Sequence, residues 1–340
     1  MPTGESSWTD PVPVTVAPGV HRIALPLPND GLRAVNVYVI ETADGLVLVD
    51  AGWALAESRE VLVAGLRGLG AGPADIVRFL VTHVHRDHYT QAVAIRRDFG
   101  TRVELGLGER PTLEILQRPD GRPLATQIDR LSRLGAPDLA RLIAGAVAHQ
   151  RVDRSHWEMP DAWLSPGPVR LPGGPTLEAV ETPGHTTGHL VFHDQDGGLL
   201  YAGDHVLSTI TPSIGFEPVP SPAPLAAFLR SLARVRARPD AMLLPAHGPV
   251  GDSVHARVDE LVHHHETRLA EMAAVLSGQS LSAADVAGAV PWTRRRRRLP
   301  DLDPFNQMLA IFETAAHLDL LVARGTARRR EVGDLLCYSA

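Results

Sequence analysis

The sequence has no lysine and only one cysteine, and it carries no basic excess. Its 33 basic residues, all arginine, stand against 39 acidic ones, which gives a net charge of −6. Nucleic-acid-binding domains usually show the opposite balance, so the composition argues against a polynucleotide partner. The single Cys337 cannot form an internal disulfide, so any metal site must use histidine and carboxylate ligands.

Long apolar runs are also missing. No stretch of about 18 uninterrupted apolar residues occurs, so we expect no membrane partner and no transmembrane helix. Residues 1–20 lack the basic start and apolar run of a signal peptide, which makes a cytoplasmic enzyme the default expectation. Apolar residues still make up 44% of the chain, enough for a sizeable core.

The first part of the chain predicts alternating strands and helices, an α/β pattern. Residues 35–41 and 46–50 are β-rich and separated by a hairpin-type turn. Residues 54–69 have helical apolar spacing, and residues 76–82 form a buried strand that leads into a helix at about 89–99. Strand patterns resume later in the chain, at 176–182, 190–194, 198–204 and 241–246.

Two segments differ from this pattern. Residues 109–165 contain three amphipathic pieces and predict a helical insert over the active site. Residues 251–340 predict a long helix at about 254–276, a short helix capped by Ser282, a helix at about 304–324 and a hairpin-like tail. We therefore expect a catalytic domain over 1–250 and a small winged-helix-like domain over 251–340.

The strongest chemical signal follows the buried strand at 76–82. His83, His85 and Asp87 alternate, so in an extended chain they would project to one side, and His88 follows at the start of the helix. Imidazole and carboxylate donors suit zinc, and they also suit iron or manganese. The sequence therefore predicts a metal site at the end of this strand.

Three later residues each follow a predicted strand and precede a loop. They are His185 in "ETPGHTTGH", Asp204 in "YAGDHV" and His247 in "LPAHGP". A glycine lies beside each, where it lets the backbone approach closely or take positive φ. Together with the first four donors, these residues are enough for two metal ions.

The motifs "THVHRDH", "TPGHTTGH", "GD" and "PAHGP", in this order, resemble the metallo-β-lactamase superfamily, and "VLVDAGW" resembles the segment that precedes its metal motif. The resemblance covers about residues 18–250. It implies a four-layer αβ/βα sandwich with two metal ions, most simply Zn²⁺. In the implied site, Asp204 bridges the ions and Asp50 orients a ligand histidine. The first ion takes His83, His85 and His185, and the second takes Asp87, His88 and His247.

Two cations that share one water lower its pKa enough to give hydroxide at neutral pH, which predicts a metal-dependent hydrolase. Asp87 is the candidate to hold or shuttle the proton of that water. His189 and His205 lie beside ligands and are candidates to stabilise an oxyanion or protonate a leaving group; hydrogen bonding to the ligands is the alternative role.

The bridging Asp204 makes the site resemble those of glyoxalase II, lactonases, thioesterases and phosphodiesterases more than that of zinc β-lactamases. Our first expectation is a small acyl substrate, such as an acyl-CoA-like thioester or an ester; a lactone or a β-lactam ranks below it. Trp157, Met159 and Trp163 would line an acyl pocket or, alternatively, pack the insert onto the body.

An endoribonuclease or phosphodiesterase is the second expectation. The two-part layout resembles the β-lactamase-like protein 2 group of the superfamily, which includes an endoribonuclease. The arginine run at 294–298 would then contact phosphates, although such a run is more often a solvated loop. The apolar pattern at 304–324 favours a packing or dimerising role over DNA reading, which leaves a homodimer open. The histidines at 263–265 predict a mostly exposed helix face and not a further metal site, since adjacent helical residues diverge by about 100° and three in a row cannot easily chelate one ion.

Overall fold

The computed structural model describes residues 7–28, 31–118, 124–148, 153–293 and 295–340. Among these residues, β1 to β7 form one mixed sheet, in that order. It is antiparallel from β1 to β4 and parallel from β4 to β7. Its strands are β1 (Val14–Ala17), β2 (Val20–Pro26), β3 (Ala34–Thr42), β4 (Gly45–Val49), β5 (Ile76–Val81), β6 (Arg102–Gly106) and β7 (Ala162–Leu164).

A second sheet has the order β12-β11-β10-β9-β8. Its strands pair antiparallel, except that β11 and β12 run parallel. They are β8 (Gly167–Arg170), β9 (Thr176–Glu181), β10 (Leu190–Asp194), β11 (Leu199–Gly203) and β12 (Met242–Pro245). The two sheets share a buried apolar layer in which Tyr38 of β3 packs edge-on against Tyr201 of β11, with ring centroids 5.6 Å apart.

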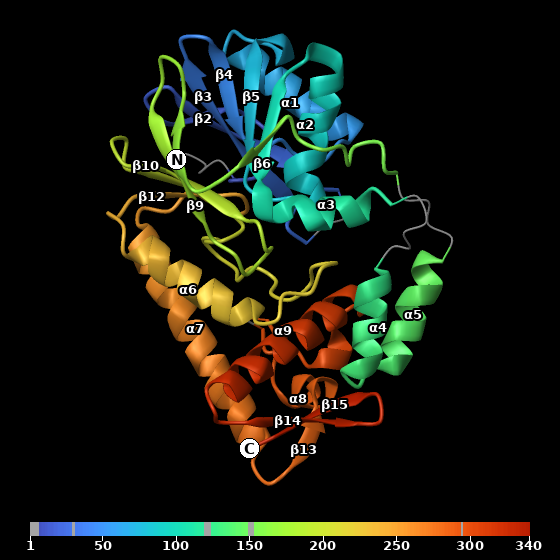
Figure 1. Ribbon diagram of the computed structural model, residues 1–340. Helices are drawn as coiled ribbons and strands as arrows, with labels where there is room; N and C mark the ends of the chain where they lie inside the picture. Colours follow the sequence, from blue (N-terminus) through green and yellow to red (C-terminus); the bar gives the residue numbers. More distant parts are fainter. Residues whose placement is uncertain (1–6, 29–30, 119–123, 149–152, 294) are drawn as a thin grey trace, which may run out of the picture.

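Helices cover both outer faces of the sheet pair (Figure 1). A second core joins the first sheet to α1 (Ala56–Gly68), α2 (Arg86–Phe99) and α3 (Arg110–Leu116). A third joins the second sheet to α6 (Pro224–Arg236) and α7 (Val254–Val275). The expected four-layer αβ/βα sandwich is therefore confirmed.

The remaining helices gather in the lower half of Figure 1 with a third sheet of order β13-β15-β14. Helices α4 and α5, from the predicted insert, pack against α9 and belong to the same core as α6 to α9. These elements are α4 (Ala125–Arg133), α5 (Pro137–Val147), α8 (Ala283–Ala289), α9 (Pro304–Ala323), β13 (Ser280–Ser282), β14 (Arg328–Val332) and β15 (Leu335–Ser339).

The C-terminal segment has the expected order of helices and a hairpin, and Ser282 caps α8 as predicted. Its resemblance to a winged helix, its boundary at residue 250 and the role of 109–165 as a cover for the active site stay predictions. Helix α9 is enclosed along most of its length, which agrees with the packing role expected for it. Within the described residues, no helix combines the length and apolar character that a membrane crossing requires.

Two expectations about side chains were wrong. His265 is fully buried rather than on an exposed face, because it lies on the same side of α7 as Leu261, Leu269 and Met272. Asp87 does not continue an extended chain from His83, because α2 already begins at the residue before it.

Two tryptophans and a methionine of the insert pack against the body. Trp157, Met159 and Trp163 are partly buried against the core beneath the first sheet. The backbone around them is tied down as well, since Arg96 of α2 donates to the Met159 carbonyl and Gln117 donates to the Trp157 carbonyl. The structure therefore supports packing of the insert onto the body, rather than an acyl pocket, as the role of these residues.

Candidate metal centre

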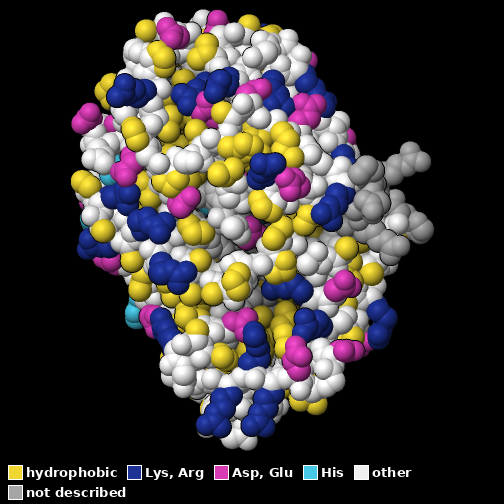
Figure 2. Space-filling model, in the orientation of Figure 1, with side chains coloured by type: hydrophobic (Ala, Val, Ile, Leu, Met, Phe, Trp, Pro, Cys, Tyr) yellow, Lys and Arg dark blue, Asp and Glu magenta, His cyan; other side chains and the backbone are white. Residues whose placement is uncertain are grey.

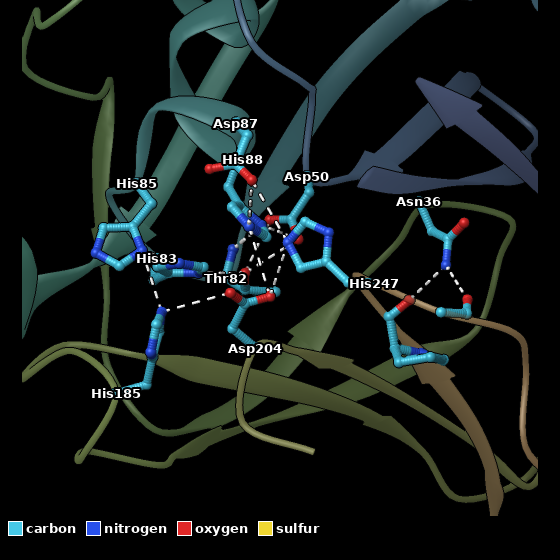
Figure 3. Close-up of polar contacts among 12 residues, drawn as sticks. Asn36, Asp50, Thr82, His83, His85, Asp87, His88, His185, Asp204 and His247 are labelled. Carbon is cyan, nitrogen blue, oxygen red and sulfur yellow. Dashed lines mark hydrogen bonds and ion pairs between the residues drawn. The ribbon is translucent and has the colours of Figure 1, made fainter. Parts of the chain in front are cut away.

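All seven predicted donors lie at one edge of the sandwich, where strands from both sheets end (Figure 3). His83 and His85 follow β5, and His85 is the residue just before α2, whose first turn carries Asp87 and His88. His185 lies in the loop between β9 and β10, Asp204 follows β11, and His247 follows β12. Within each of two groups, one ligand atom per residue lies within 4.8 Å of the others: His83, His85, His185 and Asp204 in one, and Asp87, His88 and His247 in the other.

Asp204 lies between these two groups. One of its carboxylate oxygens, Oδ2, is 3.4 Å from His185 Nε2 in the first group. The other, Oδ1, is 3.6 Å from His88 Nε2 and 3.3 Å from His247 Nε2 in the second. A carboxylate in this position can contribute one oxygen to each of two ions.

In the first group, the facing atoms are ring nitrogens of three histidines. His83 Nε2 is 2.9 Å from His85 Nδ1, which is 3.1 Å from His185 Nε2. In the second group, Asp87 Oδ2 is 3.4 Å from His247 Nε2. Burial lowers the pKa of His85 to about 3, so its imidazole is neutral and able to donate a lone pair to a metal.

Partners outside the centre fix the tautomer of several ligands. His185 Nδ1 donates to the Ser213 carbonyl at 2.8 Å, and His247 Nδ1 donates to the Ala34 carbonyl at 2.7 Å. Because the carbonyl oxygen only accepts, each Nδ1 carries a proton, so in the neutral ring each Nε2 turns a lone pair toward the centre. Ligand histidines in zinc sites are oriented in the same way. For His247, burial opposes the charged form, but the carboxylates of Asp204 and Asp87 outweigh burial and raise the pKa, so metal binding there would displace a proton.

Asp50 orients His88, a third histidine of the centre. Its Oδ2 accepts from His88 Nδ1 at 2.9 Å, and its Oδ1 accepts from the backbone N–H of Thr82 at 2.8 Å. Asp50 takes a left-handed backbone with φ of 62°, directly after β4. Burial disfavours the charged form of His88, but the surrounding carboxylates, Asp50 foremost, raise its pKa to about 10, so metal binding must displace a proton.

The centre leaves buried polar atoms without a partner. His88 Nε2, His247 Nε2 and Asp204 Oδ1 are enclosed and make no hydrogen bond. Buried polar groups in folded proteins are almost always satisfied, so three unpartnered atoms facing one point fit the binding of a ligand. Neutral imidazole nitrogens and carboxylate oxygens suit a divalent metal ion, and the residues fit a two-metal centre.

His189 and His205 are both fully buried beside the ligands. The Asp204 backbone N–H donates to His189 Nε2 at 3.1 Å, so the other ring nitrogen carries the proton, which it donates to Thr182 Oγ1 at 2.8 Å. These bonds favour a positioning role for His189. His205 packs edge-on against Phe228, with a centroid distance of 5.1 Å. Burial lowers the pKa of both histidines, His205 to about 3. Their catalytic roles stay predictions.

Two buried glutamates were missed in the sequence. Glu109, at the end of a short 3₁₀ turn after β6, accepts a hydrogen bond from Thr186 Oγ1. It thereby links the turn after β6 to the loop that carries His185. Glycine is required at Gly188, since a Cβ there would lie 2.1 Å from the Glu109 nitrogen.

Glu217 holds the same loop from the other side. Its two carboxylate oxygens accept from the backbone N–H and the hydroxyl of Thr187, at 2.7 and 2.9 Å. Burial raises the pKa of Glu109 to about 8 and that of Glu217 to about 7. Isolated glutamates give no motif, and the only signal in the sequence was the glycine-rich setting of Glu109.

Asn36 and Tyr38 of β3 hold the loop that carries His247. The Asn36 amide donates to the carbonyls of Pro245 and Gly248, at 2.9 and 2.8 Å (Figure 3). The Tyr38 hydroxyl donates to the Pro245 carbonyl at 2.8 Å. The first sheet thus positions His247, a candidate ligand that the second sheet supplies.

Comparison with known proteins agrees with this geometry. Residues 30–247 match the metallo-β-lactamase superfamily, and the chain belongs to it. The lactamase-like protein adaB of Aspergillus niger is 26% identical over 245 residues, which are 72% of this chain and 59% of that protein. The chain therefore spans about three fifths of the length of this relative.

Two further similarities bear on the layout. The β-lactamase-like protein 2 homolog of Caenorhabditis elegans is 32% identical over 127 residues, covering 36% of this chain and 40% of that protein. The crystal structure of a metallo-β-lactamase family protein from Thermus thermophilus superimposes with a TM-score of 0.77 at 26% identity. It covers 96% of this chain and 99% of the other, so the similarity extends through the C-terminal segment.

Proposed function

We propose that this metallo-β-lactamase superfamily hydrolase holds two divalent cations, zinc in the first place, and hydrolyses a small thioester or ester. His83, His85 and His185 would hold one ion and Asp87, His88 and His247 the other, with Asp204 shared. The observation that carries the proposal is the set of unpartnered buried atoms on His88, His247 and Asp204, which face one another, together with the second Asp204 oxygen that faces His185.

A bound metal pair would polarise the scissile carbonyl group and lower the pKa of water to near neutrality. Asp87 would orient the attacking water. Its side chain is 13% exposed, so water reaches it, and it lies beside two imidazoles. Burial opposes ionisation, but the imidazoles of His88 and His247 outweigh it and hold the pKa of Asp87 below its usual range. The ionised carboxylate accepts a hydrogen bond from water, which aims the water's lone pair at the substrate.

The acyl substrate class rests on Asp204, since an aspartate at this position of the sequence motif resembles the pattern of thioesterases and glyoxalase II, and on the charge of the chain. Basic and acidic side chains are interspersed on the face drawn in Figure 2, without the basic stripe that polynucleotides require. The predicted arginine run is described from Arg295 to Arg298, with Arg294 outside the described residues; these four side chains are exposed in a turn. They keep an endoribonuclease or phosphodiesterase as the second candidate.

One assay panel separates these functions. Metal-quantified protein is offered acyl-CoA and glutathione thioesters, simple esters, a lactone, bis-p-nitrophenyl phosphate and single-stranded RNA. We expect thioester or ester cleavage that chelator abolishes and added Zn²⁺ restores, with RNA left intact. Cleavage of RNA or of the phosphodiester in place of the acyl substrates would overturn the proposal.

The variant Asp87→Ala is assayed on the same substrates. We expect it to lose at least one metal equivalent and nearly all turnover while its circular dichroism stays unchanged. Asp196→Ala, in an exposed turn, controls for the loss of an aspartate and should keep both. Full metal content and full activity in Asp87→Ala would refute the assigned site.

A further inference from the structure

A second cluster of potential ligands lies outside the metal centre, between α7 and α9. One ring nitrogen from each of His264 and His265 and one carboxylate oxygen of Glu313 lie within 4.8 Å of one another. The ligand atoms within each group of the main centre lie within the same distance of one another. His264 is partly exposed, Glu313 is partly buried and His265 is fully buried.

A chain of hydrogen bonds determines the tautomer of His265. His317 Nδ1 lies 2.7 Å from the backbone carbonyl of Glu313, which only accepts, so this nitrogen carries the proton of the neutral ring. His317 Nε2 is therefore an acceptor, and His265 Nδ1 donates to it at 3.1 Å. His265 Nε2 is left with a bare lone pair.

That lone pair has no partner. His265 Nε2 is buried without a hydrogen bond, as are nitrogens of the main centre. A buried acceptor of this kind is destabilising unless something binds it. An imidazole with one nitrogen hydrogen-bonded through its N–H and the other bare is the form in which histidine ligates metals. His317 would thus orient His265 as Asp50 orients His88.

The charges around Glu313 set the strength of the site. Its carboxylate makes no hydrogen bond or ion pair that the described residues supply, and burial raises its pKa to about 7. The facing cation is Arg268, whose guanidinium is engaged by Glu271 and the Pro291 carbonyl and lies over the ring of Trp292. Its positive charge opposes a metal ion, so binding should be weaker here than at the main centre.

We propose that His264, His265 and Glu313 bind a divalent transition-metal cation of the zinc type and so join α7 to α9. Two imidazoles and one carboxylate are a ligand set that zinc accepts, with water completing the coordination. The site is one aromatic layer away from the main centre. His265 packs edge-on against Phe228, at 5.5 Å between centroids, and Phe228 packs in the same way against His205, the neighbour of Asp204.

Equilibrium dialysis against buffered Zn²⁺, with metal counted by mass spectrometry, tests the site. We expect wild-type protein to take up one equivalent more than His264→Ala and Glu313→Gln. His263→Ala removes the adjacent exposed histidine and should match wild type. His264 is partly exposed and glutamine has the shape of glutamate, so both variants should fold; circular dichroism checks this.

The comparison is made against wild type, so it does not depend on how many ions the main centre holds or on any activity. Equal uptake by wild type, His264→Ala and Glu313→Gln would overturn the proposal. An equal loss in His263→Ala would also overturn it, since exposed histidines would then account for the extra metal. Failure of the main-centre proposal would appear instead as no loss of metal in Asp87→Ala.

Discussion

Asp50 is a charged partner, and it differs in this from the other described groups that orient His185 and His247 in the main centre. Ser213 and Ala34 offer carbonyl oxygens to their histidines, whereas Asp50 offers a buried carboxylate to His88. A charged acceptor strengthens the hydrogen bond and also increases the electron density on the ligating nitrogen. The binding affinity of the ion assigned to Asp87, His88 and His247 should therefore depend on Asp50 more than the distance between Asp50 and that ion suggests.

Asp50→Asn tests this dependence. Asparagine tolerates the left-handed backbone at this position, but it has one acceptor oxygen, so the change removes the charge and leaves either His88 Nδ1 or the Thr82 N–H without its acceptor. We expect about 10–100-fold weaker binding of the ion assigned to Asp87, His88 and His247. Competition with a chromophoric chelator measures the affinity of each ion. Unaltered affinity would assign Asp50 to folding alone, and Asp44→Asn, in an exposed turn, is the control.

Glu109 predicts a pH dependence of stability. Burial raises its pKa from 4.5 to about 8, so the folded state holds a proton that the unfolded state releases. Between about pH 4.5 and 8 the folded state binds more protons than the unfolded state, so this group's contribution to stability falls as the pH rises. Glu109→Gln carries no titrating group and should lose that slope.

The measurement is urea unfolding of metal-free wild type and Glu109→Gln across this range. The free energy of unfolding of the variant should rise relative to wild type as the pH increases, and the difference should level off above about pH 8. A constant difference at every pH would show that Glu109 is ionised in the folded protein.

Single residues were predictable from the sequence where a motif supplied them. The seven donors and Asp50 stand at strand ends in a recognisable order, so the sequence alone predicts that their side chains lie close together. Glu109 and Glu217 could not be found in this way, because their partners Thr186 and Thr187 are 77 and 30 positions away. His265 had a usable signal, since the apolar spacing of Leu261 and Leu269 places it on the buried side of α7.

At the scale of elements, the segment 213–217 connects the helical part of the molecule to the metal centre. Toward the centre, the Ser213 carbonyl accepts from His185 and the Glu217 carboxylate accepts from Thr187. Toward the helices, the carbonyls of Gly215 and Phe216 accept from side chains of α4. No sequence pattern predicts this arrangement, because a proline-rich loop has no periodicity that assigns its carbonyls to partners.

Glu217→Ala should disturb this connection. The Thr187 backbone N–H would lose its buried acceptor, which costs about 1–3 kcal/mol of stability. The loop that carries His185 would loosen, so the ion assigned to His83, His85 and His185 should bind more weakly than the other. Glutamine at this position can accept from the N–H and donate to the hydroxyl, so Glu217→Gln should rescue most of both effects. Equal weakening of both ions, by chelator competition, would contradict a local role for Glu217.

The whole molecule has a core that the sequence did not reveal. Leu131 and Ile143, from the predicted insert, belong to the same buried cluster as residues of α6 to α9 and of the second sheet. Amphipathic spacing predicted that these helices bury one face, but it cannot say which other element covers that face. The predicted boundary at residue 250 would separate α4 and α5 from α9, against which both helices pack.

This shared core predicts how the protein unfolds. Leu131→Ala, at a fully buried position of α4, should destabilise the chain by about 2–5 kcal/mol. Leu142→Ala, at a position 57% exposed on α5, should change stability by no more than about 0.5 kcal/mol. Because the core is shared, the loss in Leu131→Ala should also appear as faster hydrogen exchange in α9, far away in sequence.

A fragment of residues 1–250 should in turn fail to unfold cooperatively, since removing α9 uncovers the apolar faces of α4 and α5. If that fragment unfolds in a sharp transition and the hydrogen-exchange rate in α9 is the same in Leu131→Ala as in wild type, the two predicted domains are independent. The shared cluster would then contribute little to their stability.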